Sequence, residues 1–435
     1  MKMELDVCLG KVGTSVGKLV FVRNGPRVFT QFAYFQDWLD NKDTFNVSPD
    51  LTATPGYQTR KAATKEDSLF FLALGDTEPD AWGRRVIARA HAKRREDDPT
   101  MGALTELDYL CAVDDFSRMG ALRLRNLHGA YLESLPAGRR ATPPMLELEQ
   151  MLSASRSVEL GKETAKDLAY LRGKGTSLGG MRPKCSILDE DGLLNVPFVD
   201  MRYVPEPVYL IERFDRVVDK KSLRTTDRLT APKASRLHII DACQLLNKDR
   251  TFKHSGATLD ALSQVIDRTT NKLATRTGLF RWLVFNILVG NDDCHLKNLS
   301  FHVRPDGIWL APHYDLLCTG SYHTKTFADE RATWNQVQMT FPLPGAQTFG
   351  DVTLGAVLAA AQQLGMPEPA ARRIVQEVTS RVEKAFAIIV AEHEAGTKNT
   401  PPERAVYTAV EARLLRVVQY ITLKDMLLRL RGTPS

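Results

Sequence analysis

The segment formed by residues 288–300, with the sequence LVGNDDCHLKNLS, is the first candidate for chemistry in this chain. It follows an apolar run, FRWLVFNILV, and begins with a glycine. Asp293 stands five residues before Asn298, so a carboxylate able to accept a hydroxyl proton lies close to an amide able to bind a metal. Carboxylate and amide oxygens suit a hard divalent cation, and Lys297 could contact a phosphate as a point charge. The segment therefore predicts a metal and phosphate site, although Lys297 could equally be solvated.

A second acidic residue, Asp315, lies in the sequence LAPHYDLLCTG, after a run typical of a β-strand. Burying an unpaired carboxylate among apolar residues is costly, and a divalent cation is one partner that would offset the cost. The alternative is that Asp315 caps the start of a helical turn. The order of Asp293, Asn298 and Asp315 matches the catalytic base and magnesium ligands of protein kinases, which favours the cation. His295 is expected to orient the loop backbone rather than bind metal, because no histidine lies four residues away.

A glycine-rich stretch, GKGTSLGGMRPK at residues 173–184, carries four glycines in eight residues and ends in Lys184. Glycine lets a backbone approach phosphate oxygens and direct its N–H groups toward them. The stretch does not fit the Walker A pattern. It is either a phosphate-binding loop or a flexible surface loop.

The elements that must position these residues change character along the chain. Alternating apolar residues predict strands at 3–10, 16–24 and 27–35, with Asn24-Gly25 marking a hairpin. Further along, helices are predicted at 67–74, 79–95, 105–113, 144–154 and 163–171, with a strand at 120–125. Beyond the glycine-rich stretch, strands give way to helices at 237–246, 259–265, 275–289, 354–364, 368–393 and 402–430, with a hairpin at 299–303 and 308–310. Strands followed by a mainly helical body are the layout of a two-lobed kinase.

Length and composition fit a protein of two or three domains. The 58 basic and 52 acidic residues give a net charge of only +6, which does not by itself indicate nucleic-acid binding. Basic residues gather between Arg84 and Arg95. They form either a solvated helix face or a contact surface for nucleic acid or an acidic partner. Six scattered cysteines form neither a disulfide framework nor a zinc pattern. No secretory signal or membrane span is apparent, so we expect a cytoplasmic protein with reduced thiols.

Four motifs in this order, SLGGMRPK, ERFDR, VGNDDCHLKN and YDLL, resemble the HipA family, the kinase toxins of bacterial toxin–antitoxin modules. Two earlier segments, FLALGDTEPDAWGRR and MGALRLR, resemble the N-terminal subdomain of that family. The likeness runs from about residue 4 to residue 330. It implies an α+β, two-lobed, protein-kinase-like fold with an N-terminal β-rich subdomain (1–125), a shortened N-lobe with the glycine-rich loop (126–217) and a mainly helical C-lobe (218–435).

The resemblance also implies roles for particular residues. Asp293 would be the catalytic base, Asn298 and Asp315 would hold Mg²⁺, and His295 and Lys297 would support them. The nucleotide-binding residues would be Leu178, Gly179, Gly180, Met181, Arg182, Lys184, Glu212 and Phe214, with the last two at the adenine hinge. Ser177 would be autophosphorylated, adding negative charge beside the loop. The cofactors would be ATP and Mg²⁺, the substrate a protein such as an aminoacyl-tRNA synthetase. The partner would be a helix-turn-helix, HipB-like antitoxin that binds operator DNA.

One departure concerns the lysine that kinases place on the α- and β-phosphates. Only 26 residues, 185–210, separate Lys184 from the strand of ERFDR, and none of them is a lysine. They include three prolines, and a useful helix of about 10–12 residues has no room beside the strands. Either Lys184 or Arg182 substitutes, or the phosphates are poorly held. An active kinase, a pseudokinase that binds an antitoxin, and a metal-dependent phosphohydrolase are therefore the three candidate functions.

Overall fold

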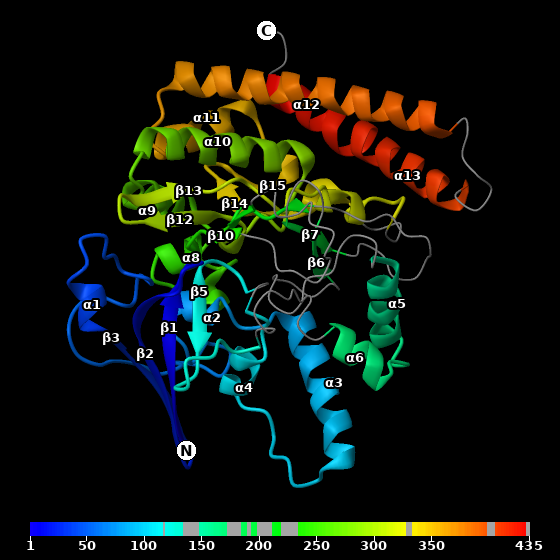
Figure 1. Ribbon diagram of the computed structural model, residues 1–435. Coiled ribbons are helices and arrows are strands. Elements are labelled where there is room, and N and C mark those ends of the chain that lie inside the picture. Colours follow the sequence, from blue (N-terminus) through cyan, green and yellow to red (C-terminus); the bar gives the residue numbers. More distant parts are fainter. Residues whose placement is uncertain are drawn as a thin grey trace. The chain divides into compact units, whose positions relative to one another are not determined.

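The computed structural model describes residues 1–115, 118–133, 148–171, 184–188, 193–197, 211–218, 234–327, 333–397 and 405–431. The chain forms two compact units. Unit 1 contains residues 1–240 and 302–305, and unit 2 contains residues 241–301 and 306–435. Both helices and sheets are present (Figure 1), which confirms the expected α+β fold.

Unit 1 is built on a five-stranded antiparallel sheet with the order β4-β3-β2-β1-β5. Its strands are β1 (Lys2–Leu9), β2 (Thr14–Asn24), β3 (Arg27–Tyr34), β4 (Gln58–Arg60) and β5 (Leu122–Arg125). The predicted hairpin is confirmed, with Asn24 paired to Arg27 across a two-residue loop. Gly25 opens this loop at a φ of 58°, a conformation that glycine adopts without steric cost. The strands predicted at 3–10, 16–24, 27–35 and 120–125 are therefore confirmed with shifted ends, whereas β4 was not predicted.

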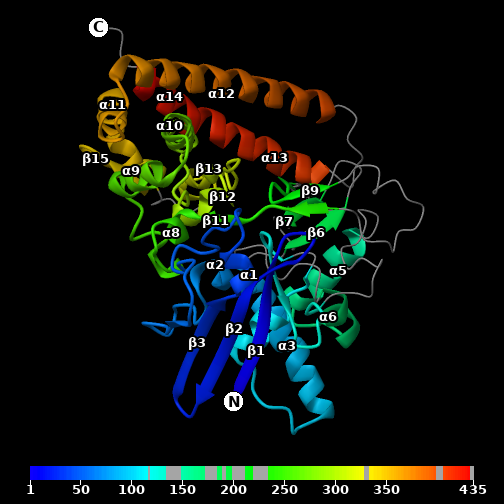
Figure 2. The same cartoon turned by 60° about the vertical axis from the view of Figure 1, so that its left-hand side comes forward.

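The helices of unit 1 are α1 (Gln36–Leu39), α2 (Leu72–Gly75), α3 (Ala81–Asp97), α4 (Glu106–Cys111), α5 (Leu148–Glu159) and α6 (Ala165–Leu171). Side chains of α3, α5 and α6 share one apolar cluster, made of Trp82, Val86, Ala154, Val158, Leu168 and Leu171. The three helices lie together in both views of the molecule (Figures 1 and 2). The predicted helices at 79–95, 105–113, 144–154 and 163–171 are confirmed with shifted ends.

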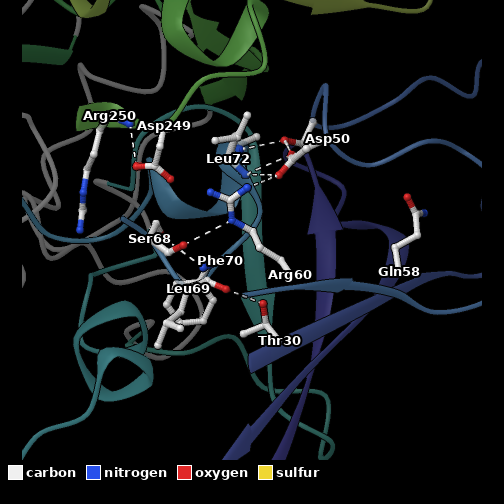
Figure 3. Close-up of polar contacts among 12 residues, drawn as sticks. Thr30, Asp50, Gln58, Arg60, Ser68, Leu69, Phe70, Leu72, Asp249 and Arg250 are labelled. Atoms are coloured by element: carbon white, nitrogen blue, oxygen red, sulfur yellow. Dashed lines mark hydrogen bonds and ion pairs between the residues drawn. The ribbon is translucent and has the colours of Figure 1, made fainter. Parts of the chain in front are cut away.

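The helix predicted at 67–74 is wrong over its first five residues, and a polar cluster shows why (Figure 3). The Ser68 hydroxyl accepts a hydrogen bond from the Phe70 N–H, a local turn that competes with helix formation. The Asp50 carboxylate accepts from the Leu72 N–H at 3.1 Å and forms an ion pair with Arg60 at 2.9 Å. The Leu72 N–H is the first of α2 and would have no partner inside the helix, so its bond to Asp50 stabilises a helix that begins at Leu72.

Two small sheets follow in unit 1. One joins β6 (Lys184–Leu188), β7 (Leu193–Pro197) and β8 (Ile211–Glu212), and the other joins β9 (Arg216–Val218) to β10 (Ala234–Arg236). In the first sheet β7 is antiparallel to both neighbours, and Lys184 is paired with Pro197 at the end of the hairpin. Of residues 185–210, which were expected to be too few for a lysine-bearing strand and helix, residues 189–192 and 198–210 lie outside the described residues.

Unit 2 begins with α8 (Ala242–Leu245), a short 3-10 turn η2 (Arg250–Phe252), α9 (Leu259–Arg268) and α10 (Lys272–Val289). The predicted hairpin is present as β12 (Ser300–Arg304) and β13 (Gly307–Leu310). The helix predicted at 237–246 is wrong over its first five residues, because residues 239–241 form strand β11 (Ile239–Asp241) and the helix α8 begins at Ala242. Asp241 and Gln244 form a reciprocal capping box, which fixes the start of the helix after residue 241.

The remainder of unit 2 consists of β14 (Gln338–Leu343), β15 (Ala346–Thr348), α11 (Leu354–Gln363), α12 (Glu368–Thr397), α13 (Ala405–Val417) and α14 (Lys424–Arg431). The hairpin of β14 and β15 was not predicted. A π-helical stretch, Val418–Leu423, separates α13 from α14 where one helix was expected. Helix α10 packs against α12 and α14 (Figures 1 and 2). None of the helices in the described part of the chain has the length and hydropathy needed to cross a membrane.

Candidate active site

The polar loop starts where α10 ends, at Gly290. This residue adopts the left-handed conformation, with φ 66° and ψ 45°, and its N–H bonds the Ile287 carbonyl at 3.1 Å. Its own carbonyl accepts from the Gly320 N–H at 2.7 Å. A Cβ at residue 290 would lie 2.8 Å from the Thr422 methyl group. Glycine is therefore required both for the turn and for the close packing that fixes the start of the loop.

Asn291 connects three parts of the site through its buried side chain, which is 2% exposed. Its Nδ2 donates to Asn286 Oδ1 on α10 at 2.7 Å and to the Asp315 carbonyl at 3.4 Å. Its Oδ1 accepts from the Asp293 N–H at 3.1 Å. One amide thus fixes the backbones of both candidate acidic residues. The sequence interpretation did not assign Asn291 a role, and its only signal was an amide directly after the helix-ending glycine.

Asp293 and Asn298 belong to one tight turn. The Asn298 Nδ2 donates to the Asp293 carbonyl at 2.8 Å, and the His295 N–H donates to the same carbonyl at 2.9 Å. Asn298 is buried, whereas the Asp293 side chain is 53% exposed. The Asn298 Nδ2 is engaged in this bond, and none of the described residues donates to its Oδ1. The turn therefore presents an accessible carboxylate beside an oriented amide oxygen.

Asp315 has a φ of 56° and is exposed. Left-handed backbone at a residue other than glycine is strained, and such strain is concentrated at functional sites. The next helical turn, η4 (Thr319–His323), starts after Cys318 and has no side-chain cap. The alternative interpretation of Asp315 as a helix cap is therefore wrong. The backbones of Asp293 and Asp315 meet at the Asn291 amide, as a shared site requires.

Lys297 is held by Asp241. Its Nζ lies 2.5 Å from Asp241 Oδ2, and the Asp241 side chain is only 4% exposed. The Lys297 carbonyl accepts from the Tyr314 hydroxyl, which also bonds Ser300. Lys297 is thus not simply solvated, as one interpretation had it. Asp241 was missed because its sequence position, in an expected helix, gave no sign of this pairing.

His295 and Cys294 complete the loop as buried side chains. Burial is the main cause that lowers the pKa of His295 to about 3, and the positive charge of Lys253 is the second cause. Burial likewise raises the pKa of the Cys294 thiol to about 12. Both groups are therefore uncharged near neutral pH. The Nε2 atoms of His295 and of His254 each lie 3.9 Å from Asp293 Oδ1, a grouping that no spacing in the sequence indicated.

The remaining predicted site residues lie in unit 1 or outside the described residues. The latter group is Ser177, Leu178, Gly179, Gly180, Met181 and Arg182. Lys184 begins strand β6. Glu212 ends β8 and is exposed. The ring of Phe214 contacts the His302 ring edge-on, with centroids 6.1 Å apart.

The charged residues of ERFDR serve a structural purpose in unit 1. Asp215 is buried and lies 2.6 Å from Arg213 and 2.9 Å from Arg216. Burial opposes its charge, but the two guanidinium groups hold the pKa of Asp215 well below its usual range. Asp215 also accepts from the Gly120 N–H at 2.8 Å. The motif therefore ties the β8–β9 segment to the start of β5.

The basic run on α3 is partly internal. Arg84 pairs with Glu78 and Glu106, whereas Arg85 pairs with Glu159 on α5. Arg89 pairs with Glu163 just before α6. These arginines link the helices of unit 1, and the more distal Lys93, Arg94 and Arg95 are exposed. The structure thus gives the first half of the run a structural role.

Comparisons with known proteins show which family and which fold this chain resembles. Residues 190–386 match the family model of the HipA-like C-terminal domain. The chain is 29% identical over 126 residues to the serine/threonine-protein kinase toxin HipA of Shewanella oneidensis, covering 26% of this chain and 27% of that protein. It is 32% identical over 120 residues to Y4mE of Sinorhizobium fredii, provisionally named a kinase, covering 27% and 26%. The matched segments span about a quarter of each curated relative.

A solved structure covers far more of the chain. The complex of HipA and HipB with operator DNA from Shewanella oneidensis MR-1 contains a chain similar to this one, with a TM-score of 0.59. The match includes 99% of this chain and 100% of that chain at 16% sequence identity. At this level of identity, the likeness establishes a shared fold.

Proposed function

We propose that this chain, whose residues 190–386 match the HipA-like C-terminal domain, is an ATP- and Mg²⁺-dependent serine/threonine protein kinase of the HipA toxin type. The observation that carries the proposal is the arrangement around Asn291. A single buried amide fixes the backbone of Asp293 and that of Asp315, while Asn298 closes the turn on Asp293.

Each residue has a defined chemical task in the proposed reaction. The exposed Asp293 carboxylate accepts the proton of a substrate serine or threonine hydroxyl, as a general base. Asn298 Oδ1 and the Asp315 carboxylate are oxygen donors of the kind that Mg²⁺ prefers, so the residues present fit this cation. When bound, Mg²⁺ neutralises charge on the ATP phosphates. Lys297, positioned by Asp241, adds a positive charge next to this turn.

Substrate and partners extend the proposal. Family resemblance favours a protein substrate, such as an aminoacyl-tRNA synthetase, and autophosphorylation at Ser177. The similar chain from Shewanella oneidensis was solved with HipB and operator DNA. We therefore expect a helix-turn-helix antitoxin to bind this chain in the cytoplasm and to link it to DNA.

Labelled ATP tests the activity directly. The full chain, incubated with Mg²⁺ and bacterial lysate, should transfer the γ-phosphate to itself or to a lysate protein. Asp293→Ala should remove labelling, and Ser177→Ala should remove only the label on the chain itself. Equal labelling by wild type and Asp293→Ala, or none by either, would contradict the proposal.

A catalytically impaired binding module is the second candidate. It is favoured by the lack of any lysine in residues 185–210 and by the position of Lys184 at the end of the β6–β7 hairpin. Calorimetry with Mg-ATP separates the two candidates. Micromolar binding supports the kinase, whereas no binding at millimolar nucleotide supports a module that holds an antitoxin without transferring phosphate.

A further inference from the structure

Two histidines flank the proposed catalytic base. The Nε2 atoms of His254 and His295 each lie 3.9 Å from Asp293 Oδ1. Ligand atoms of the three residues all lie within 4.8 Å of one another. The two imidazole rings are nearly perpendicular, with centroids 4.8 Å apart. No other cluster of three such residues is found in the part of the chain that the structure describes.

Backbone contacts hold the two histidines together. His254 follows η2, and His295 precedes the 3-10 turn η3 (Leu296–Asn298). The Leu296 N–H donates to the Lys253 carbonyl at 3.2 Å, so residues adjacent to each histidine are hydrogen-bonded to one another. The His254 carbonyl is itself fixed by the Ala257 N–H at 3.0 Å. The cluster is therefore a product of the fold of unit 2 rather than a chance meeting of mobile side chains.

The donor set differs from that of the magnesium residues. Two imidazoles and a carboxylate suit Zn²⁺ and similar transition metals, whereas Mg²⁺ prefers oxygen ligands. Three protein ligands with a fourth position left to water is a common arrangement for accessible zinc. Tetrahedral Zn²⁺ places its ligand atoms about 3.3 Å apart. The two 3.9 Å distances must close by about half an ångström, and the separation of the two imidazoles, at most 4.8 Å, by up to about 1.5 Å. The His254 and Asp293 side chains are each 53% exposed and can make this movement.

We propose that His254, His295 and Asp293 form a transition-metal site, distinct from the Mg²⁺ ligands, whose occupation by Zn²⁺ inhibits the kinase. Binding of Zn²⁺ would use the carboxylate lone pair that otherwise accepts the substrate proton. The binding claim depends only on the three side chains. The inhibition claim rests on the proposed function.

The state of His295 is compatible with metal binding. Its low pKa keeps the imidazole neutral near pH 7, the form that binds metals. Its Nε2 is the ring nitrogen directed at the cluster, 3.9 Å from Asp293 Oδ1, while its Nδ1 is buried without a hydrogen-bond partner among the described residues. Lys253 and Lys297 bring positive charge nearby, and the pairing of Lys297 with Asp241 partly compensates it.

Cobalt provides a direct readout of binding. The full chain, stripped of metals and kept in excess Mg²⁺, is titrated with Co²⁺, whose visible absorption bands report a low-coordinate site with nitrogen ligands. Wild type should bind one Co²⁺ that Zn²⁺ displaces. His254→Ala should weaken binding by about tenfold or more, because loss of even an outer-shell partner of a metal ligand costs about 10–100-fold in affinity. His128→Ala, which removes an exposed histidine of unit 1, is the matched control and should bind as wild type does. Equal Co²⁺ affinity in wild type and His254→Ala overturns the site.

A kinase assay tests the inhibition separately. Free Zn²⁺ is set with a metal buffer, because ATP itself binds Zn²⁺, and each variant is compared with its own rate without Zn²⁺. Wild type and His128→Ala should lose activity at the Zn²⁺ concentration that displaces Co²⁺, and His254→Ala should need about tenfold more. Full activity of wild type with the site occupied overturns the inhibition. Specific Co²⁺ binding by a chain that transfers no phosphate supports the site and contradicts the proposed kinase activity.

Discussion

Lys297 Nζ and Asp241 Oδ2 lie 2.5 Å apart, and this ion pair joins the candidate catalytic loop to the start of α8. Asp241 is almost fully buried and at the same time caps α8 through the Gln244 N–H. A carboxylate with two such roles cannot move away when its partner is lost. The position of Lys297 is therefore coupled to the stability of this part of unit 2.

Replacing Lys297 with Met should lower the free energy of unfolding by about 2–3 kcal/mol, because it leaves a buried carboxylate without its cation. This loss of unfolding free energy is at the low end of what breaking a buried ion pair costs, because the Lys297 side chain is 28% exposed. Asp241→Asn keeps an acceptor for the cap, so adding it to Lys297→Met should restore part of the loss. Urea denaturation of both single variants and the double variant gives the coupling energy. Additive effects would show that the pair contributes nothing.

Asp315 is predicted to combine backbone strain with a cation-binding role. Asp315→Gly removes the carboxylate and relieves the left-handed backbone, whereas Asp315→Ala removes the carboxylate and keeps the strain. The glycine variant should be about 1 kcal/mol more stable than the alanine variant. Both should lose phosphoryl transfer and Mg²⁺-dependent ATP binding. Retained activity in the glycine variant would exclude Asp315 as a metal ligand.

Gly290→Ala should destabilise the chain in two separable ways. The left-handed backbone disfavours any Cβ by about 1–2 kcal/mol, and this Cβ would also overlap the Thr422 methyl group. Thr422→Ser removes that methyl group, so the double variant should recover the overlap cost and retain the backbone cost. Thermal denaturation measures both terms, and equal stability of the single Gly290→Ala and double variants would exclude the overlap.

Acid should destabilise unit 1 through His238. Burial lowers the pKa of His238 from its usual 6.5 to about 4, so the unfolded chain binds a proton that the folded chain resists. The contribution is fully present above pH 6.5 and is lost as the pH falls toward 4, by about 3 kcal/mol. His238 Nε2 lies 2.7 Å from the Val47 carbonyl, and Nδ1 is buried without a partner among the described residues.

His238→Gln removes this titration. Urea denaturation at pH 7 and pH 4.5 should show a smaller acid loss for His238→Gln than for wild type. The exposed His128→Gln serves as the control and should behave like wild type. If the free energy of unfolding of His238→Gln falls between pH 7 and pH 4.5 as much as that of wild type, groups other than His238 cause the loss.

Local signals were sufficient for much of the fold. The β2–β3 hairpin and α10 were predicted because alternation, apolar length and a terminal glycine are properties of adjacent residues. The helix expected at 237–246 failed because the Asp241 cap overrode apolar periodicity. The helix expected at 67–74 failed because Asp50, distant in sequence, fixes its start.

The residues of the candidate site also fall into two groups: those that the sequence could predict and those whose roles arise only from long-range contacts. The order of Asp293, Asn298 and Asp315 could be taken from the sequence because each falls in a recognisable motif. Asn291 and Asp241 could not, because their roles arise from hydrogen bonds and an ion pair formed only in the folded chain. The grouping of His254 with His295 likewise depends on the contact between Leu296 and Lys253.

The alkylation rate of the buried Cys294 thiol can measure how often the loop opens. Thiolates are the form that alkylating reagents attack, and the thiol next to Asp293 is both 5% exposed and held protonated by burial. Electrophilic inhibitors aimed at this cysteine should therefore react slowly with the closed loop. The labelling rate of Cys294, followed by mass spectrometry, would therefore measure how often the loop that carries Asp293 separates from α10 and exposes the thiol.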